Sequence, residues 1–576
     1  MSNHVIVDYE VPVTMRDGTV LRAVVFRPEG EGKWPVLITR TPYSKDAVAS
    51  GSPDDAHLDI LSMVRSGYAV VVQDCRGRFT SDGPWDMATS LKQEADDGVD
   101  TVAWAASLPY SSGNVGSFGG SYVGFTQWSM LCNDTPALKA AIPSCTFADP
   151  HEGFWYRSGA MELGLFVQWV MGIHADTIMK TVQDPAVIGQ FFSDMYTLPE
   201  QMKILPLRGY APFERDQVPA SALEIIQRGY ADRTIAEPLT FAGKHDRAKA
   251  PTINVTGWYD VFLKGTLQHF AEMRSSGATE QARDSKLIVG PWTHWGSNER
   301  VGNAYFGLNS SAAAAGLTHI QKEWFDHHLK GIENSISTMA PVKLFVMGDN
   351  EWRDEQEWPL ARTEYTSYYL HMGGALNTEL PGAEQPDRYD YDPADPVPTA
   401  GGACLVYPQF PEGPQDHRVI ESRPDVLTFT TPVLEEDVEV TGPVKVFLWA
   451  STNVKDTDFV ARLIDVQPDG YAFNLADGII RGRYRDYAKD GSESLLEPGK
   501  PYLFEIDLWA TSNVFKKGHC IRLEITSSCF PRWDRNPNSG NAFGTDTEAD
   551  FVVAEQTILH DAEHPSHIVL PIIPRM

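Results

Sequence analysis

The stretch that decides the fold is Asn114-Val-Gly-Ser-Phe-Gly-Gly-Ser-Tyr-Val-Gly124. It predicts a short buried strand, a sharp turn at Ser121 and the start of a helix. Such a turn lifts a serine above the end of a parallel sheet, where its hydroxyl can act as a nucleophile. The fit to G-x-S-x-G is incomplete, because Val123 fills the last position and the glycine follows at Gly124. The alternative is a turn whose glycines only allow close packing.

Two later apolar strands supply an acid and a histidine in a matching order. Pro251-Thr-Ile-Asn-Val-Thr-Gly-Trp-Tyr-Asp260 ends in an aspartate, and Lys286-Leu-Ile-Val-Gly-Pro-Trp-Thr-His294 ends in a histidine. Open α/β sheets build their sites beyond the carboxyl ends of strands, and in the α/β-hydrolase fold the acid and the histidine follow the serine. We therefore predict Ser121, Asp260 and His294 as a catalytic triad. A helix-capping aspartate and a loop histidine are the structural alternatives.

The patterns of strand and helix divide the chain into three parts. Strands over 34–43 and 68–74 alternate with helical spacing over 93–107, which predicts a doubly wound parallel sheet. Helical spacing broken by prolines over 149–240 predicts an inserted cap. Short alternating runs after about residue 342 predict an all-β jelly roll, with 380–398 as a surface loop. The predicted domains are the α/β-hydrolase domain (1–145 and 242–350), the helical cap (146–241) and the jelly roll (351–576).

Composition limits the classes of partner. The chain has 576 residues, 42% of them hydrophobic, and a formal net charge of −29. This charge argues against nucleic acid and anionic membranes, because both bind basic surfaces. The start of the chain lacks a signal-peptide pattern and no apolar run reaches membrane-spanning length, so we expect a cytoplasmic protein. The six scattered cysteines predict buried free thiols.

The chain resembles the X-Pro dipeptidyl-peptidase-like (CocE/NonD) serine hydrolases, a family that includes bacterial cocaine esterase. The resemblance extends along the whole chain and is carried by Arg40-Thr-Pro-Tyr43, Gln73-Asp-Cys-Arg-Gly-Arg78, Gly119-Gly-Ser-Tyr-Val-Gly124, Gly257-Trp-Tyr-Asp260 and Gly290-Pro-Trp-Thr-His294. In that family the serine motif is usually G-x-S-Y-x-G, which this chain matches. The resemblance implies the same three-part architecture and a cofactor-independent enzyme.

The predicted site includes two oxyanion donors and a substrate pocket. One donor is the backbone N–H of Tyr122, the residue after the nucleophile. The other should come from the loop after the strand over 34–43, and the resemblance implies the hydroxyl of Tyr43. It also implies an acyl pocket between cap and sheet. By position, the pocket residues are Trp155, Trp169, Phe262, Leu405 and Tyr407.

Three functions follow from these residues. The first is a serine esterase that hydrolyses small carboxylic esters through an acyl-enzyme. The second is an acylase or X-Pro-type dipeptidyl aminopeptidase using the same triad, and the third is a carbohydrate-binding protein without activity. Val261-Phe-Leu-Lys264 lacks the acids by which related α-amino acid ester hydrolases hold an ammonium group. No metal site is predicted, since Pro565 interrupts the spacing of His560, His564 and His567. Relatives form dimers, so a homodimer is an expectation.

Overall fold

A mixed sheet forms the centre of the first part of the chain in this computed structural model, which describes residues 4–50, 58–406 and 410–575. Within the described residues ten strands pair in the order β1-β2-β4-β3-β5-β6-β9-β10-β13-β14. Pairing is parallel from β4 to β13 and antiparallel at both edges. The strands are β1 (Val5–Thr14), β2 (Val20–Pro28), β3 (Trp34–Thr41), β4 (Ala69–Asp74), β5 (Ser111–Gly120), β6 (Leu138–Ser144), β9 (Ile253–Tyr259), β10 (Lys286–Thr293), β13 (Val342–Val346) and β14 (Glu351–Glu355).

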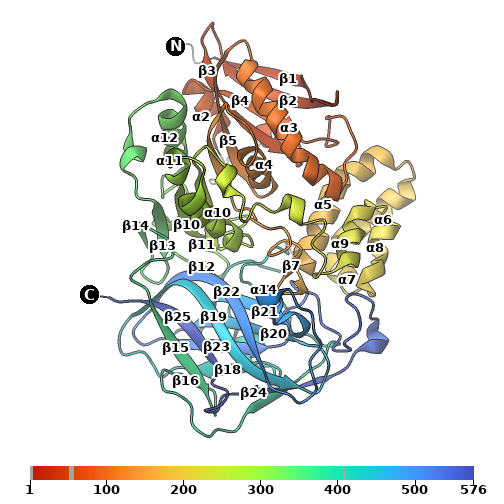
Figure 1. The fold of residues 1–576 in the computed structure, drawn as a ribbon, viewed down its shortest axis with the longest axis vertical. Coiled ribbons are helices and arrows are strands. Elements are labelled where there is room, and N and C mark those ends of the chain that lie inside the picture. The colour runs from red at the N-terminus through yellow and green to blue at the C-terminus, as the bar shows by residue number, and fades with distance from the viewer. Residues whose placement is uncertain (1–3, 51–57, 407–409, 576) are drawn as a thin grey trace.

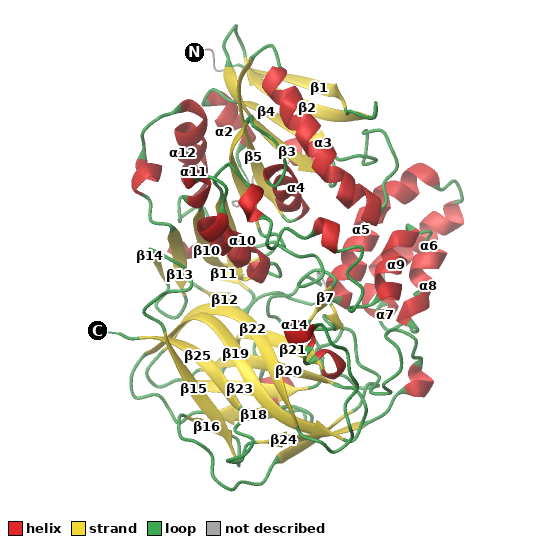
Figure 2. Cartoon of the chain, viewed as in Figure 1, coloured by secondary structure: helices red, strands yellow, loops and turns green. Residues whose placement is uncertain are grey.

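Helices cover both faces of this sheet (Figure 2). On β3, Val36 and Ile38 belong to one core and Leu37 to another, because successive strand residues point to opposite faces. The first core receives α3 (Met87–Ser107) and α4 (Tyr122–Leu131), and the second receives α2 (Ile60–Arg65) and α12 (Leu317–Lys330). The predicted α/β organisation is therefore confirmed.

A group of helices is inserted between β6 and β9 and lies beside the sheet (Figure 1). After the short strands β7 (Tyr156–Arg157) and β8 (Ala160–Met161), the chain forms these helices. They are α5 (Leu163–Thr181), α6 (Pro185–Tyr196), α7 (Leu198–Gln201), α8 (Ala211–Arg215) and α9 (Ala220–Arg228). Apolar residues of α5, such as Phe166 and Val170, belong to the same core as Val36 and Ile38 of the sheet. The inserted helices thus pack on the sheet domain rather than forming a separate core.

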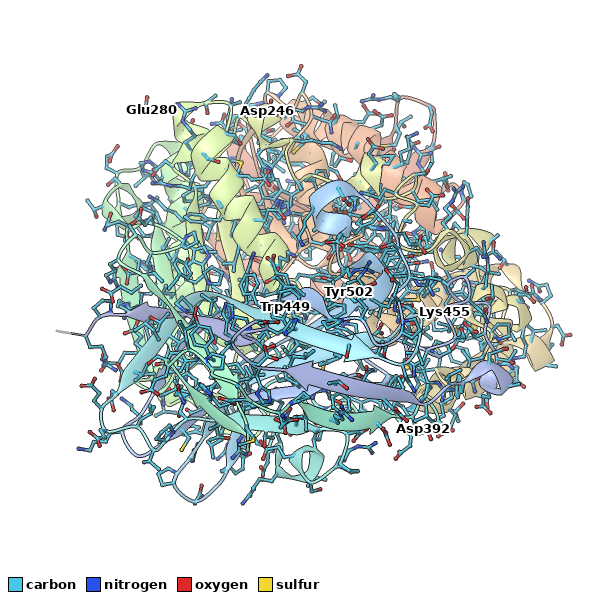
Figure 3. The ribbon with its side chains drawn as sticks, turned by 60° about the horizontal axis from the view of Figure 1, so that its bottom comes forward. Asp246, Glu280, Asp392, Trp449, Lys455 and Tyr502 are labelled. Atoms are coloured by element: carbon cyan, nitrogen blue, oxygen red, sulfur yellow. The ribbon has the colours of Figure 1, made fainter. Side chains whose placement is uncertain are left out.

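The rest of the chain is mainly β-strands, as predicted. Among the described residues one sheet follows the order β17-β24-β19-β25-β15-β16-β18-β23-β20-β21, with β22 paired to β19. Trp449 and Tyr502 mark the adjacent strands β19 and β22 in Figure 3. The strands are β15 (Glu364–His371), β16 (Ala375–Asn377), β17 (Asp387–Tyr391), β18 (Leu427–Thr430), β19 (Val438–Thr452), β20 (Asp458–Val466), β21 (Ala472–Arg481), β22 (Tyr502–Phe515), β23 (Cys520–Thr526), β24 (Ala554–Leu559) and β25 (His567–Ile573).

One prediction in this part was wrong. The sequence over 380–398 was expected to be a surface loop, but its centre forms β17 and pairs antiparallel with β24. Tyr389 and Tyr391 are buried on one face of this strand, while the acidic Asp390 between them is exposed. The many Asp and Pro residues around β17 hide the alternation of so short a strand.

Buried charges join this part of the chain, which we call the β-domain (residues 364–573), to the rest of the chain. The Arg157 guanidinium lies 3.9 Å from the ring centre of Trp509, and its Nη1 is 3.2 Å from Asp477 Oδ1. Removing one member of such a buried pair typically costs about 3–5 kcal/mol, because the other charge is left unpaired. The Arg157 contact is therefore sensitive to substitution of either charged partner. None of the helices in the described ranges is both long and apolar enough to cross a membrane.

Candidate active site

Ser121 lies on a strained turn between β5 and α4. Its φ of 60° and ψ of −127° are unusual for a residue with a Cβ, and such strain often marks a functional position. The Ser121 amide donates to the Ser144 carbonyl of β6 at 3.0 Å, which holds the turn against the sheet. Gly119 is needed here because a Cβ on it would lie 2.3 Å from Val123 Cγ1. The turn thus places the Ser121 hydroxyl beyond the end of the sheet.

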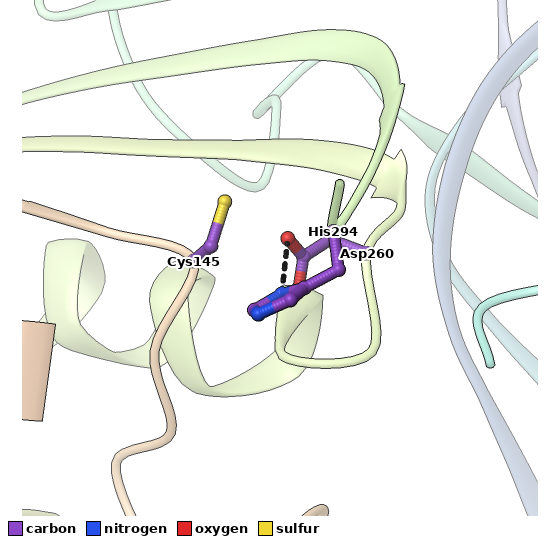
Figure 4. Close-up of side chains that lie close together, drawn as sticks. All are labelled: Cys145, Asp260 and His294. Carbon is purple, nitrogen blue, oxygen red and sulfur yellow. Dashed lines mark hydrogen bonds and ion pairs between the residues drawn. The ribbon is translucent and has the colours of Figure 1, made fainter. Parts of the chain in front are cut away.

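His294 and Asp260 complete a chain of contacts from Ser121. His294 Nε2 is 3.0 Å from Ser121 Oγ. On the other side of the ring, His294 Nδ1 is 3.3 Å from Asp260 Oδ2, and Figure 4 shows this contact. Asp260 is fully buried, and its Oδ1 accepts the Phe262 backbone N–H at 2.6 Å. A carboxylate facing Nδ1 favours the imidazole tautomer with its proton on Nδ1, so Nε2 can accept the Ser121 proton.

Close packing of β9 on β10 sets the spacing between Asp260 and His294. A Cβ on Gly257 would lie only 2.1 Å from the backbone oxygen of Trp292. Only glycine lets the two strand ends approach this closely. The glycines of the Gly-Trp-Tyr-Asp and Gly-Pro-Trp-Thr-His motifs therefore have a packing role, and a Cβ on Gly290 would likewise meet the Trp292 ring at 2.3 Å.

Charge near the imidazole comes from two carboxylates. Burial opposes a positive charge on His294, but the neighbouring charges of Asp260 and Glu412 prevail and raise the pKa of His294 above its ordinary value. Burial also raises the pKa of Glu412 to about 7. The Glu412 carboxylate interacts with the Thr293 hydroxyl and the Trp295 amide, the residues on either side of His294. Glu412 belongs to the β-domain, and no sequence motif pointed to it.

The two predicted oxyanion donors lie beside Ser121. The Tyr43 hydroxyl accepts the Trp169 indole N–H at 3.0 Å and faces Ser121 within hydrogen-bonding reach. Because the hydroxyl end is withdrawn from bulk water, the pKa of Tyr43 is raised, and the group stays a proton donor at neutral pH. Tyr122 begins α4, so its N–H is one of the first helical amides that have no carbonyl partner within their own helix.

Ser121 stands between two hollows. One is a narrow pocket of about 20 Å³, and the other is a largely apolar cavity of about 780 Å³ that also contains His294, Tyr43 and Cys145. The narrow pocket is lined by Leu91, Ser121, Tyr122, Phe147, Phe154, Leu165, Trp169, Phe262 and Leu405. Two separate spaces around one hydroxyl suit a reaction that divides its substrate into two fragments.

The structure places the predicted pocket residues unequally. Trp169, Phe262 and Leu405 line the narrow pocket. Trp155 is buried behind it, against Phe154 and His151, and does not line it. Phe154 lines the narrow pocket, although the sequence analysis selected the neighbouring Trp155. Both residues are aromatic, so the sequence alone does not show which of the two side chains points into the pocket. Tyr407 lies outside the described residues.

The three histidines near the chain end, which were not expected to bind a metal, each contact a different partner. His560 Nε2 is 3.0 Å from Asp387 Oδ2, His564 pairs with Asp561, and His567 Nδ1 is 2.7 Å from the Pro565 carbonyl. Over the described ranges, the residues whose ligand atoms meet within 4.8 Å are instead Cys145, Asp260 and His294.

Comparisons with known proteins find relatives along the whole chain. Residues 17–296 match the model of the X-Pro dipeptidyl-peptidase (S15) family, and residues 334–569 match its C-terminal non-catalytic domain. The chain is 37% identical to cocaine esterase of Rhodococcus sp. (strain MB1 Bresler), with 98% of each chain covered.

Two solved structures resemble the whole chain. They are an aminopeptidase from a marine-sediment Thaumarchaeota archaeon (TM-score 0.82, 25% identity) and an α-amino acid ester hydrolase (TM-score 0.81, 26% identity). Each covers 99% of this chain and 96% of its own. Together the comparisons show an enzyme of the serine hydrolase class, with an α/β-hydrolase-type domain followed by an all-β domain.

Proposed function

Because the chain belongs to the X-Pro dipeptidyl-peptidase (S15) family of serine hydrolases, in the group that includes cocaine esterase, we propose that it hydrolyses small carboxylic esters. The observation that supports this most directly is the contact chain from Ser121 Oγ through His294 to the buried Asp260. Its elements are a nucleophile, a base and an orienting acid, each placed at the end of a sheet strand.

The proposed reaction passes through an acyl-enzyme. Ser121 Oγ attacks the ester carbonyl carbon while His294 Nε2 takes its proton, and Asp260 stabilises the imidazolium. The Tyr43 hydroxyl and the Tyr122 N–H hold the oxyanion of the tetrahedral intermediate. The bond to the alcohol oxygen then breaks, and His294 returns the proton to that oxygen. A water repeats the sequence and releases the acid.

The two hollows assign the substrate fragments. The leaving oxygen must lie near His294 Nε2 to receive its proton, and His294 lines the larger cavity. We therefore assign the alcohol to the 780 Å³ cavity and the acyl group to the narrow pocket. The narrow pocket is much smaller than the other cavity, so acetyl and propionyl groups fit it better than benzoyl.

The inserted helices and the C-terminal strands have defined places in this proposal. Helix α5 brings Leu165 and Trp169 to the acyl pocket, which is the role of a cap domain. The C-terminal strands, which we assign as a jelly roll, support the loop that carries Leu405 and Glu412. We also propose a cytoplasmic location, where the six free cysteines would stay reduced, and a homodimer.

Amide cleavage is the second candidate. It is favoured by the match to a peptidase family and by the archaeal aminopeptidase. Against it, the segment after Asp260 carries no acid to hold a substrate ammonium, and its Lys264 is paired with Asp507 at 3.0 Å. A carbohydrate-binding protein without activity is less well supported, because the serine, histidine and aspartate are all present and in contact.

Ester and anilide substrates distinguish these functions. The wild type and Ser121→Ala are assayed with p-nitrophenyl acetate, butyrate and benzoate and with the matched p-nitroanilides. The proposal expects an initial burst on esters that the alanine abolishes, with the acetate preferred. Faster anilide than ester turnover would favour the peptidase. Lack of turnover together with lack of fluorophosphonate labelling at Ser121, in a folded sample that binds glycan, would favour the binding protein.

A further inference from the structure

A cysteine thiol lies beside the proposed catalytic pair. Cys145 follows β6, and its sulfur, an Asp260 oxygen and an imidazole nitrogen of His294 all lie within 4.8 Å of one another (Figure 4). Its backbone has a φ of 47°, and its N–H donates to the Val255 carbonyl at 2.8 Å, so the residue is fixed in position. The thiol lies within hydrogen-bonding reach of Asp260. The reaction proposed above uses no thiol.

The distances resemble those of a tetrahedral metal site. With metal–ligand bonds of about 2.1 Å, two ligand atoms on a tetrahedron are about 3.4 Å apart. His294 Nδ1 is 3.3 Å and 3.4 Å from the two Asp260 oxygens. A charge-assisted N–H···O⁻ bond is usually shorter, about 2.7–2.9 Å. The Cys145 sulfur lies within 4.8 Å of the other two ligand atoms and would have to stay or move within ligand distance of the same ion.

The surroundings support the same three ligands. Metal-bound histidines and carboxylates are normally held by further hydrogen bonds. Here the Phe262 N–H donates to Asp260 Oδ1 at 2.6 Å and fixes the carboxylate, whose Oδ2 lies 3.3 Å from His294 Nδ1. Ser121 Oγ, 3.0 Å from His294 Nε2, can accept a hydrogen bond from an N–H at that nitrogen. Three protein ligands leave a fourth position for water, as in open zinc sites.

We propose that Cys145, Asp260 and His294 form an inhibitory site for a thiophilic divalent cation such as Zn²⁺ or Cd²⁺. On binding, the thiol proton leaves to solvent, and the metal takes the place of the proton between Nδ1 and Asp260. The imidazole proton is then carried on Nε2, which donates to Ser121 Oγ instead of accepting from it. The base is thereby blocked without any change in the Ser121–His294 contact.

The site is open to solution, and its ligand set selects soft cations. Cys145 and His294 both line the 780 Å³ cavity next to Ser121, so an ion entering by the proposed alcohol route reaches them. A thiolate with an imidazole favours Zn²⁺ and Cd²⁺, whereas Mg²⁺ and Ca²⁺ prefer oxygen ligands.

Metal binding can be tested without catalysis. The full chain carrying Ser121→Ala is titrated with CdCl₂ while the ultraviolet cadmium–thiolate charge-transfer absorption is followed. We expect one saturating equivalent, strongly reduced when Cys145→Ser is added and unchanged when Cys520→Ser is added instead. Cys520 is a matched control because it is a half-buried free thiol of the β-domain. A ¹¹³Cd NMR signal from Ser121→Ala, shifted as for one sulfur ligand, gives a measurement that does not depend on whether Cys145→Ser folds.

Inhibition of ester hydrolysis by Zn²⁺ is the second test of the metal site. Ester hydrolysis by the otherwise unmodified enzyme should fall with ZnCl₂, return with EDTA and be unaffected by MgCl₂. Losing an outer metal partner weakens binding by about 10–100-fold, so losing the sulfur ligand in Cys145→Ser should raise the Zn²⁺ inhibition constant by about 100-fold or more. Each variant is compared with its own metal-free rate.

The outcomes separate this inference from the proposed function. Cadmium binding in Ser121→Ala with no esterase activity in the parent enzyme would overturn the esterase and leave the metal site standing. Absence of both the absorption band and the NMR signal would overturn the metal site, as would a band that survives Cys145→Ser and disappears with Cys520→Ser. Equal Zn²⁺ inhibition of the parent and Cys145→Ser would also overturn it.

Discussion

Replacing Tyr43 by phenylalanine removes one proposed oxyanion donor and little else. The ring can stay where it is, packed edge-on against Tyr122 with ring centres 6.4 Å apart. Only the O–H that faces Ser121 is lost, together with the acceptor for the Trp169 indole N–H. The Trp169 indole N–H then lacks this acceptor, so the melting temperature of the variant is measured alongside its activity.

The expected loss follows from the number of donors. The site offers the Tyr43 hydroxyl and the Tyr122 amide, so the variant keeps one of two. Removing one preorganised donor typically costs about 10²–10³ in kcat, or about 2.7–4 kcal/mol. The KM should change little, since the negative charge on the substrate oxygen develops only in the transition state.

The assay measures kcat and KM for p-nitrophenyl acetate in wild type, Tyr43→Phe and Trp169→Phe. The second variant keeps an aromatic ring but loses the N–H that orients the Tyr43 oxygen, so we expect a loss of about tenfold or less, near 1.4 kcal/mol. A melting temperature close to wild type confirms that Tyr43→Phe is folded. A kcat within threefold of wild type, or a raised KM with unchanged kcat, would refute the assignment of Tyr43 as an oxyanion donor.

Three further predictions follow from the site and its strands. The rate should fall as pH drops through the pKa of His294, which is raised above its ordinary value because neighbouring Asp260 and Glu412 outweigh its burial. Glu412, whose pKa is raised to about 7, carries only part of its charge in this pH range, so Glu412→Gln should move the midpoint of the kcat/KM–pH profile to lower pH by less than the loss of a full charge would. Gly257→Ala places a Cβ 2.1 Å from the Trp292 carbonyl oxygen. It should lower the free energy of unfolding, measured with denaturant, by about 3 kcal/mol or more. The control is Gly189→Ala on α6, where the Cβ has open space, and it should leave the free energy of unfolding unchanged or raise it by about 0.5–1 kcal/mol. Trp169→Ala enlarges the acyl pocket, so the ratio of benzoate to acetate kcat/KM should rise; an unchanged ratio would place the acyl group elsewhere.

The parts of the site that the sequence predicted are those encoded in short segments. A buried strand, a glycine-bounded serine and a following helix are contiguous, so the turn at Ser121 could be located from its own residues. Asp260 and His294 each follow an apolar strand directly, and parallel strands bring their carboxyl ends to one edge of a sheet.

The remaining features depend on contacts between distant segments. Cys145 has no motif, and it meets Asp260 because β6 pairs with β9 at Ser144 and Val255. Glu412 lies more than a hundred residues after His294, on a loop whose course depends on the packing of the β-domain. Periodicity describes one segment at a time, so it cannot predict which of many carboxylates reaches the imidazole.

The β-domain is part of the candidate active site in geometric terms, although its family model is described as non-catalytic. Trp258 and Tyr259, which precede Asp260, belong to the same hydrophobic core as β-domain residues such as Val440. The Tyr259 hydroxyl donates to the Asn474 carbonyl of β21 at 3.1 Å. The β-domain thus contacts the end of β9, directly before Asp260. From the other side, Glu412 contacts the residues that flank His294. Without the β-domain, Tyr259 would lose its hydrogen bond to Asn474, and the position of Asp260 would change. His294 would also lose the neighbouring Glu412 carboxylate, so its pKa would fall.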